Sequence, residues 1–512
     1  MSVRHFDWLM HHAEARPAQT ALMDLGSGRR STYAQLNQRV ARLAGHLRHE
    51  MRVRKGDRVA VLAHNCGQHF ELMFACARLG AVYLPLNWRL TIPELAFIVG
   101  DAEPSLLAVD DACMDAGNHL RREHCAVQPM SIGGSASASY EQILQSAVPA
   151  AGAEPMFHDD VQMLMYTSGT TGFPKGALIT FGMTFWNAVN VGIPTGISSA
   201  TRLLSVMPLF HTGGLNLFAN PVFHAGGTVL LLRAFDPAGM LNMLSDPAMA
   251  ISHVFAVPTA YQMMAQSAAF ADSSFEHLEL ACVGGAATPA AVLGAWQERG
   301  VTLANGYGMT ETSPAVTLLL PRDAIRKSGS VGNALLHTET RVVDRAGRDC
   351  GADEPGELWV RGPNVSPGYW RNDKATQEAF SDGWLKTGDV ARRDADGFFY
   401  ILDRAKDMYI SGGENVYPAE IENVLSSLPE VAEAAVVGLP DDRWGESGLA
   451  IIALRQGALI EAAQVMAYCA ERLARFKLPR EIVFVDALPR TGTGKIHKPT
   501  LREQYRRSVG EC

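Results

Sequence analysis

Apolar residues near the start of the chain recur at three- and four-residue intervals, the spacing that places side chains on one face of a helix. Thr32 and Gln35 form a capping-box pattern, which predicts that the helix begins there. The apolar positions that follow are Leu36, Val40, Leu43 and Leu47. We therefore predict a helix that packs one face against a core.

Short apolar runs alternate with helical patterns beyond this helix. Residues 58–63 and 81–86 predict strands, and residues 68–79 between them predict a helix. Residues 227–232 and 278–283 continue the strand pattern. A strand–helix–strand rhythm is typical of parallel sheets covered by helices on both faces. The predicted fold class of this large N-terminal part is α/β with parallel sheets.

The pattern changes after about residue 330. Short strands separated by Asp–Gly and Pro–Gly turns predict an antiparallel β subdomain. A compact α+β unit begins after Asp403. Its expected helices cover residues 418–428 and 460–473, and its expected strands cover residues 431–439 and 449–454.

The length of the chain predicts more than one domain. A single core stops growing at roughly 250–300 residues, and this chain has 512. We assign residues 1–402 to a large N-terminal domain that binds the substrates and residues 403–512 to a small C-terminal domain.

Composition excludes several protein classes. Hydrophobic residues make up 47% and charged residues 19%, which is typical of a globular protein rather than a disordered one. The formal net charge of −8 gives no reason to expect nucleic acid as a partner. No apolar run approaches the roughly 20 residues of a membrane helix, and the N-terminus does not resemble a signal peptide. The eight cysteines contain no CxxC pair, so we expect a reduced cytoplasmic enzyme without a zinc site or disulfides.

Residues 166–176 form a loop rich in glycine and hydroxyl side chains after the apolar stretch 161–165. Backbone N–H groups, hydroxyls and a lysine in such a loop can hold a phosphate group. It is not a Walker A loop, because Gly176 and not Ser or Thr follows Lys175. Taken alone, the loop could also be a surface turn. The expected nucleotide-binding residues are Thr167, Ser168, Gly169, Thr170, Thr171, Gly172 and Lys175.

With four later motifs, this loop resembles the signature of the adenylate-forming superfamily. That superfamily includes acyl-CoA synthetases, adenylation domains that stand alone or load carrier proteins, and beetle luciferases. The matching motifs cover residues 305–311, 387–389, 403–407 and 490–495, in the family's order. The resemblance extends over essentially the whole chain, which is similar to bacterial fatty-acyl-CoA and feruloyl-type CoA synthetases.

The resemblance implies ATP, Mg²⁺ and coenzyme A as ligands. Glu311, with Thr167, would hold Mg²⁺, and Thr310 would contact the α-phosphate. Asp389 would accept the ribose hydroxyls with support from Arg404. The other nucleotide-binding residues that the resemblance implies are Gly285, Ala286, Ala287, Asn305, Gly306, Tyr307 and Lys406. Without the motifs, Glu311 could be a surface acid and Asp389 a turn cap.

Two catalytic steps follow from the same resemblance. Lys495 would stabilise charge on the α-phosphorus and the leaving pyrophosphate. The C-terminal domain would then rotate about Asp403, and Gly412 and Gly413 would line the path of the thiol of coenzyme A. Lys495 also lies in a basic tail, which could be a solvated surface or could serve the 3′-phosphate of coenzyme A.

His211, in the segment 208–214, would gate the acyl tunnel or orient the carboxylate. Its neighbours Phe210 and Thr212 offer no acid, so an amino-acid substrate is disfavoured. The expected pocket walls contain no Arg or Lys that could pair with a second carboxylate. These walls are Gly213, Gly214, Gly285, Ala286, Gly306, Met309 and Val316, with Phe185 and Trp186 as added aromatic surface.

The favoured reaction is therefore ligation of a medium- or long-chain fatty acid to coenzyme A. An aryl-propenoic acid is the alternative substrate, and a carrier-protein thiol is the alternative acceptor. Free coenzyme A is preferred because no carrier domain follows Cys512. A luciferase-like oxygenase and a non-enzymatic ATP-binding protein are the more distant alternatives. A homodimer is compatible with the sequence, and peripheral membrane contact is an option only for a long-chain acid.

Overall fold

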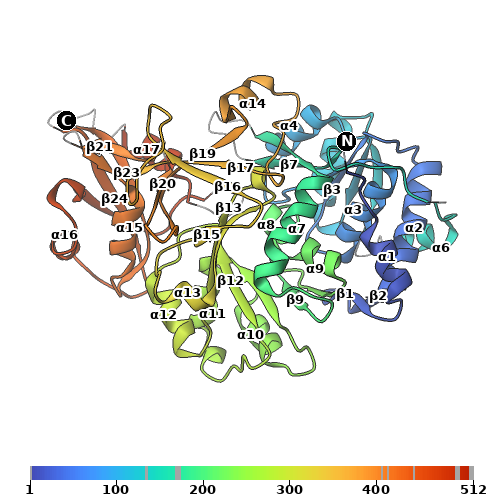
Figure 1. Cartoon of the computed structure of the whole chain (residues 1–512), viewed down its shortest axis with the longest axis horizontal. Helices are drawn as coiled ribbons and strands as arrows, with labels where there is room; N and C mark the ends of the chain where they lie inside the picture. The colour runs from blue at the N-terminus through green and yellow to red at the C-terminus, as the bar shows by residue number, and fades with distance from the viewer. Residues whose placement is uncertain are drawn as a thin grey trace.

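The computed structural model describes residues 3–132, 137–150, 152–167, 174–404, 407–411, 414–441, 444–490 and 496–506. Strands in these ranges form four sheets, and helices cover the sheets. Figure 1 shows the N-terminal elements (blue to green) at one end of the molecule and the C-terminal elements (orange to red) at the other. The predicted α/β fold with a large N-terminal part and a small C-terminal α+β part is confirmed.

The first sheet has six strands within the described ranges, in the order β6-β5-β3-β4-β7-β8. Its pairs are parallel except for the antiparallel hairpin of β7 and β8. The strands are β3 (Arg58–Leu62), β4 (Val82–Leu86), β5 (Leu106–Val109), β6 (Gln128–Ser131), β7 (Val161–Thr167) and β8 (Lys175–Thr180). Nearby helices are α2 (Tyr33–His49), α3 (Gly67–Leu79), α4 (Ile92–Ala102), α5 (Met114–Glu123) and α6 (Ser137–Ser146).

The capping box at the start of α2 is formed as predicted. The Thr32 hydroxyl accepts a hydrogen bond from the Gln35 amide at 3.2 Å, and the Gln35 side chain accepts one from the Thr32 amide at 2.9 Å. The predicted apolar face of α2 is buried in a core cluster that also contains residues of both large sheets. This shared core joins the first sheet to the second.

The second sheet has nine strands in the part of the chain that the structure describes, in the order β15-β14-β13-β12-β11-β9-β10-β1-β2. Its six middle strands are parallel, and β2, β14 and β15 are antiparallel to their neighbours. The strands are β1 (Thr20–Asp24), β2 (Arg29–Thr32), β9 (Arg202–Ser205), β10 (Thr228–Leu231), β11 (His253–Ala256), β12 (Leu280–Gly284), β13 (Ala304–Gly308), β14 (Ala315–Leu319) and β15 (Asn333–Ala334). Its helices are α1 (Trp8–Ala15), α7 (Phe181–Thr195), α8 (Thr212–Leu215), α9 (Ala219–Ala225), α10 (Pro237–Ser245), α11 (Pro258–Gln266), α12 (Ala290–Glu298) and α13 (Pro321–Ala324).

The third sheet is antiparallel, which confirms the predicted β subdomain. It consists of β16 (Glu339–Val343), β17 (Gly356–Arg361), β18 (Phe380–Ser381), β19 (Trp384–Arg393) and β20 (Phe399–Arg404), with helix α14 (Asp373–Ala379) beside it. In Figure 1 these strands (yellow to orange) lie between the two ends of the molecule.

The fourth sheet belongs to the C-terminal part and, among the residues that the structure describes there, is covered by three helices. Its strands are β21 (Tyr409–Ser411), β22 (Glu414–Val416), β23 (Val431–Asp441), β24 (Gly445–Leu454) and β25 (Glu481–Val485). The helices are α15 (Pro418–Ser426), α16 (Ala462–Ala470) and α17 (Lys498–Arg506). Helix α15 also contacts β20 of the third sheet. At this contact the buried Asp403 carboxylate accepts a hydrogen bond from the amide of Ala419 at 2.8 Å.

No helix in the described ranges has the length and hydropathy needed to cross a bilayer.

The parallel strands of both large sheets end toward loops that carry the motif residues, as expected for open α/β sheets that bind ligands at the carboxyl ends of their strands.

Candidate functional site

Glycine-rich backbone lies at the carboxyl ends of β12 and β13. Gly284 pairs with Gly306 in parallel register, and a Cβ on Gly284 would come within 2.6 Å of the Gly306 carbonyl oxygen. Gly285 follows in the left-handed region with φ +84°. It is exposed, as are Ala286 and Ala287. The structure therefore brings two predicted segments together as a flat surface with few side chains.

Tyr307 at the end of β13 connects this surface to the third sheet. Its hydroxyl donates to Oδ2 of Asp389 at 2.5 Å, and Nε of Arg404 lies 2.7 Å from Oδ1 of the same carboxylate. Asp389 and Arg404 are partners across β19 and β20. Burial, followed by the nearby Asp389 charge, raises the pKa of Tyr307 well above its ordinary value. Tyr307 therefore stays protonated and fixes the Asp389 carboxylate beside the glycine-rich surface.

Tyr369 performs the same task for Glu311 and was not predicted from the sequence. Its hydroxyl donates to Oε1 of Glu311 at 2.8 Å. Its ring lies 5.5 Å from the ammonium nitrogen of Lys175, the last charged residue of the phosphate-loop motif. Glu311 is buried in the short turn η4 (Thr310–Thr312), and β8 packs against that turn. Tyr369 therefore lies between the loop lysine and the predicted metal-binding acid.

Backbone pairing explains how Tyr369 reaches this place. Residues 366–370 run along the free edge of β8, where Trp370 N donates to Gly176 O at 2.8 Å and Leu178 N donates to Gly368 O at 3.1 Å. The amide of Ser366 also donates to the carbonyl of Glu311 at 2.7 Å. This segment holds the phosphate-loop hairpin and the Glu311 turn in one arrangement.

Burial dominates the electrostatics of Glu311. Desolvation raises the pKa of this carboxyl, while the Tyr369 hydrogen bond and the positive charge of Arg404 act in the opposite direction. A buried carboxylate of this kind gains from a bound cation, and Mg²⁺ prefers oxygen ligands. Thr167 ends β7 and pairs with Lys175, and its hydroxyl donates to the Lys175 carbonyl at 3.4 Å. The chemistry of Glu311 and Thr167 therefore fits a magnesium ion.

His211 lies at the start of the short helix α8 and shapes a tight turn. Its Nδ1 accepts a hydrogen bond from the amide of Gly213 at 3.2 Å. A Cβ on Gly214 would come within 2.2 Å of the Pro208 carbonyl oxygen, so glycine is needed at that position. His211 is partly exposed at this turn.

Phe255, at the end of β11, is a second residue that sequence analysis missed. A Cβ on Gly213 would lie 3.4 Å from its ring, and a Cβ on Gly284 would lie 3.6 Å from it. The buried Phe255 ring thus contacts both the His211 turn and the glycine-rich surface. Its position at the carboxyl end of a parallel strand was the available signal, but an aromatic residue in an apolar run also fits a core position.

Three residues predicted to line the acid pocket pack against neighbours other than the His211 turn and the glycine-rich surface. The Phe185 ring packs 5.0 Å from His158 and 5.6 Å from His224, and Trp186 packs 4.7 Å from His337. Val316 is fully buried in the core of the third sheet. The side-chain amide nitrogen of Asn305 donates to the Ser330 carbonyl at 3.0 Å, and its predicted nucleotide-binding role stays a prediction.

Several predicted site residues lie outside the described residues, and their predicted roles stay predictions. They are Ser168, Gly169, Thr170, Thr171, Gly172, Lys406, Gly412, Gly413 and Lys495.

Two family descriptions match most of the chain. The description "AMP-binding enzyme" matches residues 9–370, and "AMP-binding enzyme C-terminal domain" matches residues 420–495.

Curated proteins similar to the chain over almost their full length include three that differ in their named acid. A feruloyl-CoA synthase of Amycolatopsis sp is 40% identical and covers 97% of this chain and 98% of its own. An indoleacetate–CoA ligase of Aromatoleum aromaticum is 38% identical and covers 98% of both. The long-chain-fatty-acid–CoA ligase FadD13 of Mycobacterium tuberculosis is 36% identical and covers 99% of this chain and 100% of its own.

Solved structures agree with the computed fold. ATP-bound MatB from Rhodopseudomonas palustris has a TM-score of 0.90 and 32% identity, with 98% of this chain and 99% of that chain covered. The o-succinylbenzoate coenzyme A synthetase of Bacillus subtilis, in complex with ATP and magnesium ion, has a TM-score of 0.87 and 34% identity over the same shares.

Glu311→Gln is expected to raise the thermal unfolding midpoint at neutral pH. Burial raises the folded-state pKa of Glu311 above its ordinary value of 4.5, so the folded protein binds the proton more tightly than the unfolded chain. The folded protein therefore loses stability as pH rises from 4.5 through the raised pKa of Glu311, and glutamine, which does not ionise, removes this loss. The gain in midpoint should shrink as pH falls toward 4.5.

Scanning calorimetry of both proteins at several pH values measures this difference. Glu276→Gln, at an exposed position, is the control and should leave the midpoint unchanged. A lower midpoint for Glu311→Gln at every pH would mean that the native site stabilises the carboxylate as an anion.

Proposed function

The chain belongs to the AMP-binding enzyme family, and from this premise we propose that it joins an apolar monocarboxylic acid to coenzyme A through an acyl-adenylate. Mg·ATP and the acid would give acyl-AMP and pyrophosphate, and coenzyme A would then give acyl-CoA and AMP. The predicted resemblance to the adenylate-forming superfamily and the predicted acid–thiol ligase class are confirmed.

The observation that carries the proposal is the pair of buried carboxylates, each held by a tyrosine hydroxyl, together with the exposed backbone of residues 285–287. Asp389, held by Tyr307 of β13, suits a ribose, and the exposed Gly285–Ala286 backbone after the neighbouring strand β12 suits a flat base. Glu311, reached through Tyr369 from Lys175, suits the phosphate end of the same nucleotide. The solved relatives described above bind ATP, one of them together with magnesium ion, and we propose the same ligands for this chain.

Each residue of this chain then has a defined task. Thr167 and Glu311 would hold Mg²⁺, which when bound offsets the negative charge of the phosphates. Thr310 would contact the α-phosphate. His211 would orient the carboxylate of the acid, because its ring is fixed at the α8 turn next to Phe255. Lys495 would stabilise the charge that develops during adenylation.

The second half of the reaction requires access for a thiol. We propose that residues 403–512 rotate about Asp403, so that Lys495 leaves and Gly412 and Gly413 line the thiol path. Asp403 is suited to a junction because its carboxylate accepts the amide of Arg404, in β20 of the third sheet, at 2.7 Å and the amide of Ala419, in α15, at 2.8 Å.

An aromatic acid now ranks above the fatty acid that the sequence alone favoured. We propose that the buried Phe255 ring, which lies beside Gly213 and Gly284, forms one side of a slot for the ring of the acid. Relatives named for feruloyl and indoleacetyl groups are 40% and 38% identical to the chain. A long-chain fatty acid is the second candidate because FadD13 is 36% identical over 99% of the chain.

A panel of acids in an ATP–pyrophosphate exchange assay tests the function. We expect exchange with aryl-propenoic and aryl-acetic acids, weaker exchange with medium-chain fatty acids, and none with amino acids. Coenzyme A and a phosphopantetheinylated carrier protein are then offered separately, and coenzyme A should give the higher thioester yield. The proposal would be wrong if no acid in the panel supported ATP–pyrophosphate exchange.

Lys495→Ala should abolish adenylation and largely spare thioester formation from premade acyl-AMP. One preorganised donor is typically worth about 10²–10³ in rate, and only the first half-reaction needs it. Single-turnover measurements of each half-reaction decide the matter, with Lys374→Ala at an exposed helix position as the control. Equal loss of both half-reactions would remove this role from Lys495.

Gly213→Ala should discriminate among acids. The new methyl group would lie 3.4 Å from the Phe255 ring and 3.4 Å from Nδ1 of His211, which narrows the slot. We expect the KM of an aryl-propenoic acid to rise about tenfold while the KM of ATP stays unchanged, because lost space in an apolar pocket is worth about 1–3 kcal/mol. Gly294→Ala is the matched control, since a Cβ there meets no atom within 4 Å. If the KM of ATP rose by a similar factor, the space beside Gly213 would belong to the nucleotide site and not to the acid-binding site.

A further inference from the structure

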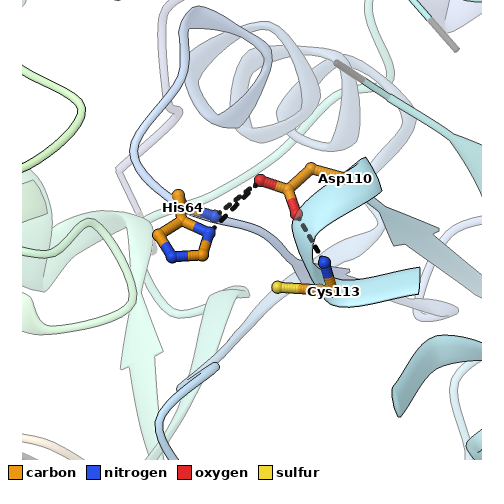
Figure 2. Close-up of side chains that lie close together, drawn as sticks. All are labelled: His64, Asp110 and Cys113. Atoms are coloured by element: carbon orange, nitrogen blue, oxygen red, sulfur yellow. Dashed lines mark hydrogen bonds and ion pairs between the residues drawn. The ribbon is translucent and has the colours of Figure 1, made fainter. Parts of the chain in front are cut away.

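A second polar cluster lies where strands of both large sheets end. His64 follows β3, Asp110 follows β5, and Arg233 follows β10 of the other sheet. Figure 2 shows the His64 ring, the Asp110 carboxylate and the Cys113 side chain close together. One ligand atom from each of these three residues lies within 4.8 Å of the others. The mechanism above uses none of them.

The arrangement suits an ion pair better than a metal ion. The Asp110 side chain is 1% exposed, and Oδ2 already accepts the His64 amide at 3.0 Å and Arg233 Nη2 at 3.0 Å. Oδ1 accepts the Cys113 amide at 3.0 Å. The guanidinium next to the carboxylate also repels a cation. Nδ1 of His64 lies 3.5 Å from Oδ2, so the imidazole also faces this buried carboxylate.

The His64 ring leads from this cluster to the acid-binding side of the site. It stacks on Trp88 with centroids 4.0 Å apart and planes 29° from parallel. Trp88 meets the Phe210 ring edge-on at 6.5 Å, and the Arg89 guanidinium lies over both rings at 4.9 and 5.8 Å. Phe210 directly precedes His211. Each ring contact fixes the orientation of the next ring.

The side chain of Asn65, the residue after His64, binds the backbone at the start of the His211 turn. Its side-chain amide donates to the carbonyl of Met207 at 3.0 Å and accepts the amide of Leu209 at 2.9 Å. Both contacts are buried or partly buried and flank Pro208, which begins the His211 turn. The loop at His64 therefore contacts the His211 turn along two independent routes.

We propose that His64 and Asp110 are positioning residues for the acid: they fix Trp88 and Phe210, and thereby the His211 turn that receives the carboxylate. The inference rests on the proposed function for the identity of the ligand at His211. It does not depend on that function for the contacts themselves. Displacing a substrate-positioning group by about 1 Å can cost up to about 10² in rate, which leaves ample room for a measurable effect.

Kinetics of four variants test the proposal in the pyrophosphate-exchange assay. His64→Ala should raise the KM of the acid about tenfold and leave the KM of ATP within about twofold. His64→Phe keeps a ring against Trp88 and should return the KM of the acid to within about threefold of wild type. Asp110→Asn should fall between these two. His277→Ala, which removes an exposed histidine elsewhere, is the matched control and should behave as wild type.

A double-mutant cycle of His64→Ala with Phe210→Leu locates the route. The two effects on the KM of the acid should be less than additive if they act through Trp88. An equal rise in the KM of ATP for His64→Ala, or a failure of His64→Phe to rescue, would overturn the proposal. So would stoichiometric zinc in the purified protein that a chelator removes and added zinc restores.

Amide hydrogen exchange without any substrate separates this inference from the proposed function. In His64→Ala the amides of Gly213 and Leu215 should exchange faster than in wild type, because the His211 turn then keeps only the Asn65 contacts. His64→Phe and His277→Ala should leave them protected. Unchanged exchange in His64→Ala would overturn the inference even if the wild-type enzyme is active, and faster exchange would support it even if no acid in the panel reacts.

Discussion

The central constraint on this molecule is the burial of two carboxylates, Glu311 and Asp389, in one site. Desolvation penalises an ionised carboxylate, so each must be supplied with donors that remain in place before any ligand arrives. Tyr369 and Tyr307 supply those donors, and burial keeps both hydroxyls protonated by raising their pKa values. Each carboxylate is therefore held in place by its own tyrosine and remains available to bind a ligand.

This constraint explains why the three sheets of the N-terminal part meet where they do. Tyr307 comes from the nine-stranded sheet, and Asp389 and Arg404 come from the antiparallel sheet. Tyr369 reaches Glu311 only because residues 366–370 pair with the edge of β8 in the first sheet. Each acid thus receives its hydroxyl from another structural unit. The relative placement of the sheets and the geometry of the site are fixed by the same hydrogen bonds.

Sequence patterns predicted those parts of the fold that local chemistry determines. The Thr32 capping box, the α3 helix and the strands β3 and β4 follow from spacing over a few residues, and all are formed. The family resemblance implied that residues 305–307 and Asp389 bind the same nucleotide, and in the structure Tyr307 donates to Asp389. Tyr369 and Phe255 escaped because their roles depend on contacts between residues distant in sequence. A tyrosine paired along a sheet edge and a phenylalanine in an apolar strand carry no local signal of a site. The His64 cluster was missed for the same reason.

The balance of charges in the described part of the site gives a physical reason why Lys495 should enter the site for only one half-reaction. Among the described residues that we assign to the nucleotide, Glu311, Asp389, Lys175 and Arg404 carry formal charges, and these four charges cancel. Arg404 is already paired with Asp389 at 2.7 Å. A magnesium-bound triphosphate would still carry negative charge, and adenylation concentrates that charge on the leaving pyrophosphate. An additional cation present at all times would stabilise bound ATP as well as the transition state and would gain little rate. We therefore expect the enzyme to bring Lys495 in for adenylation and to remove it once pyrophosphate has formed.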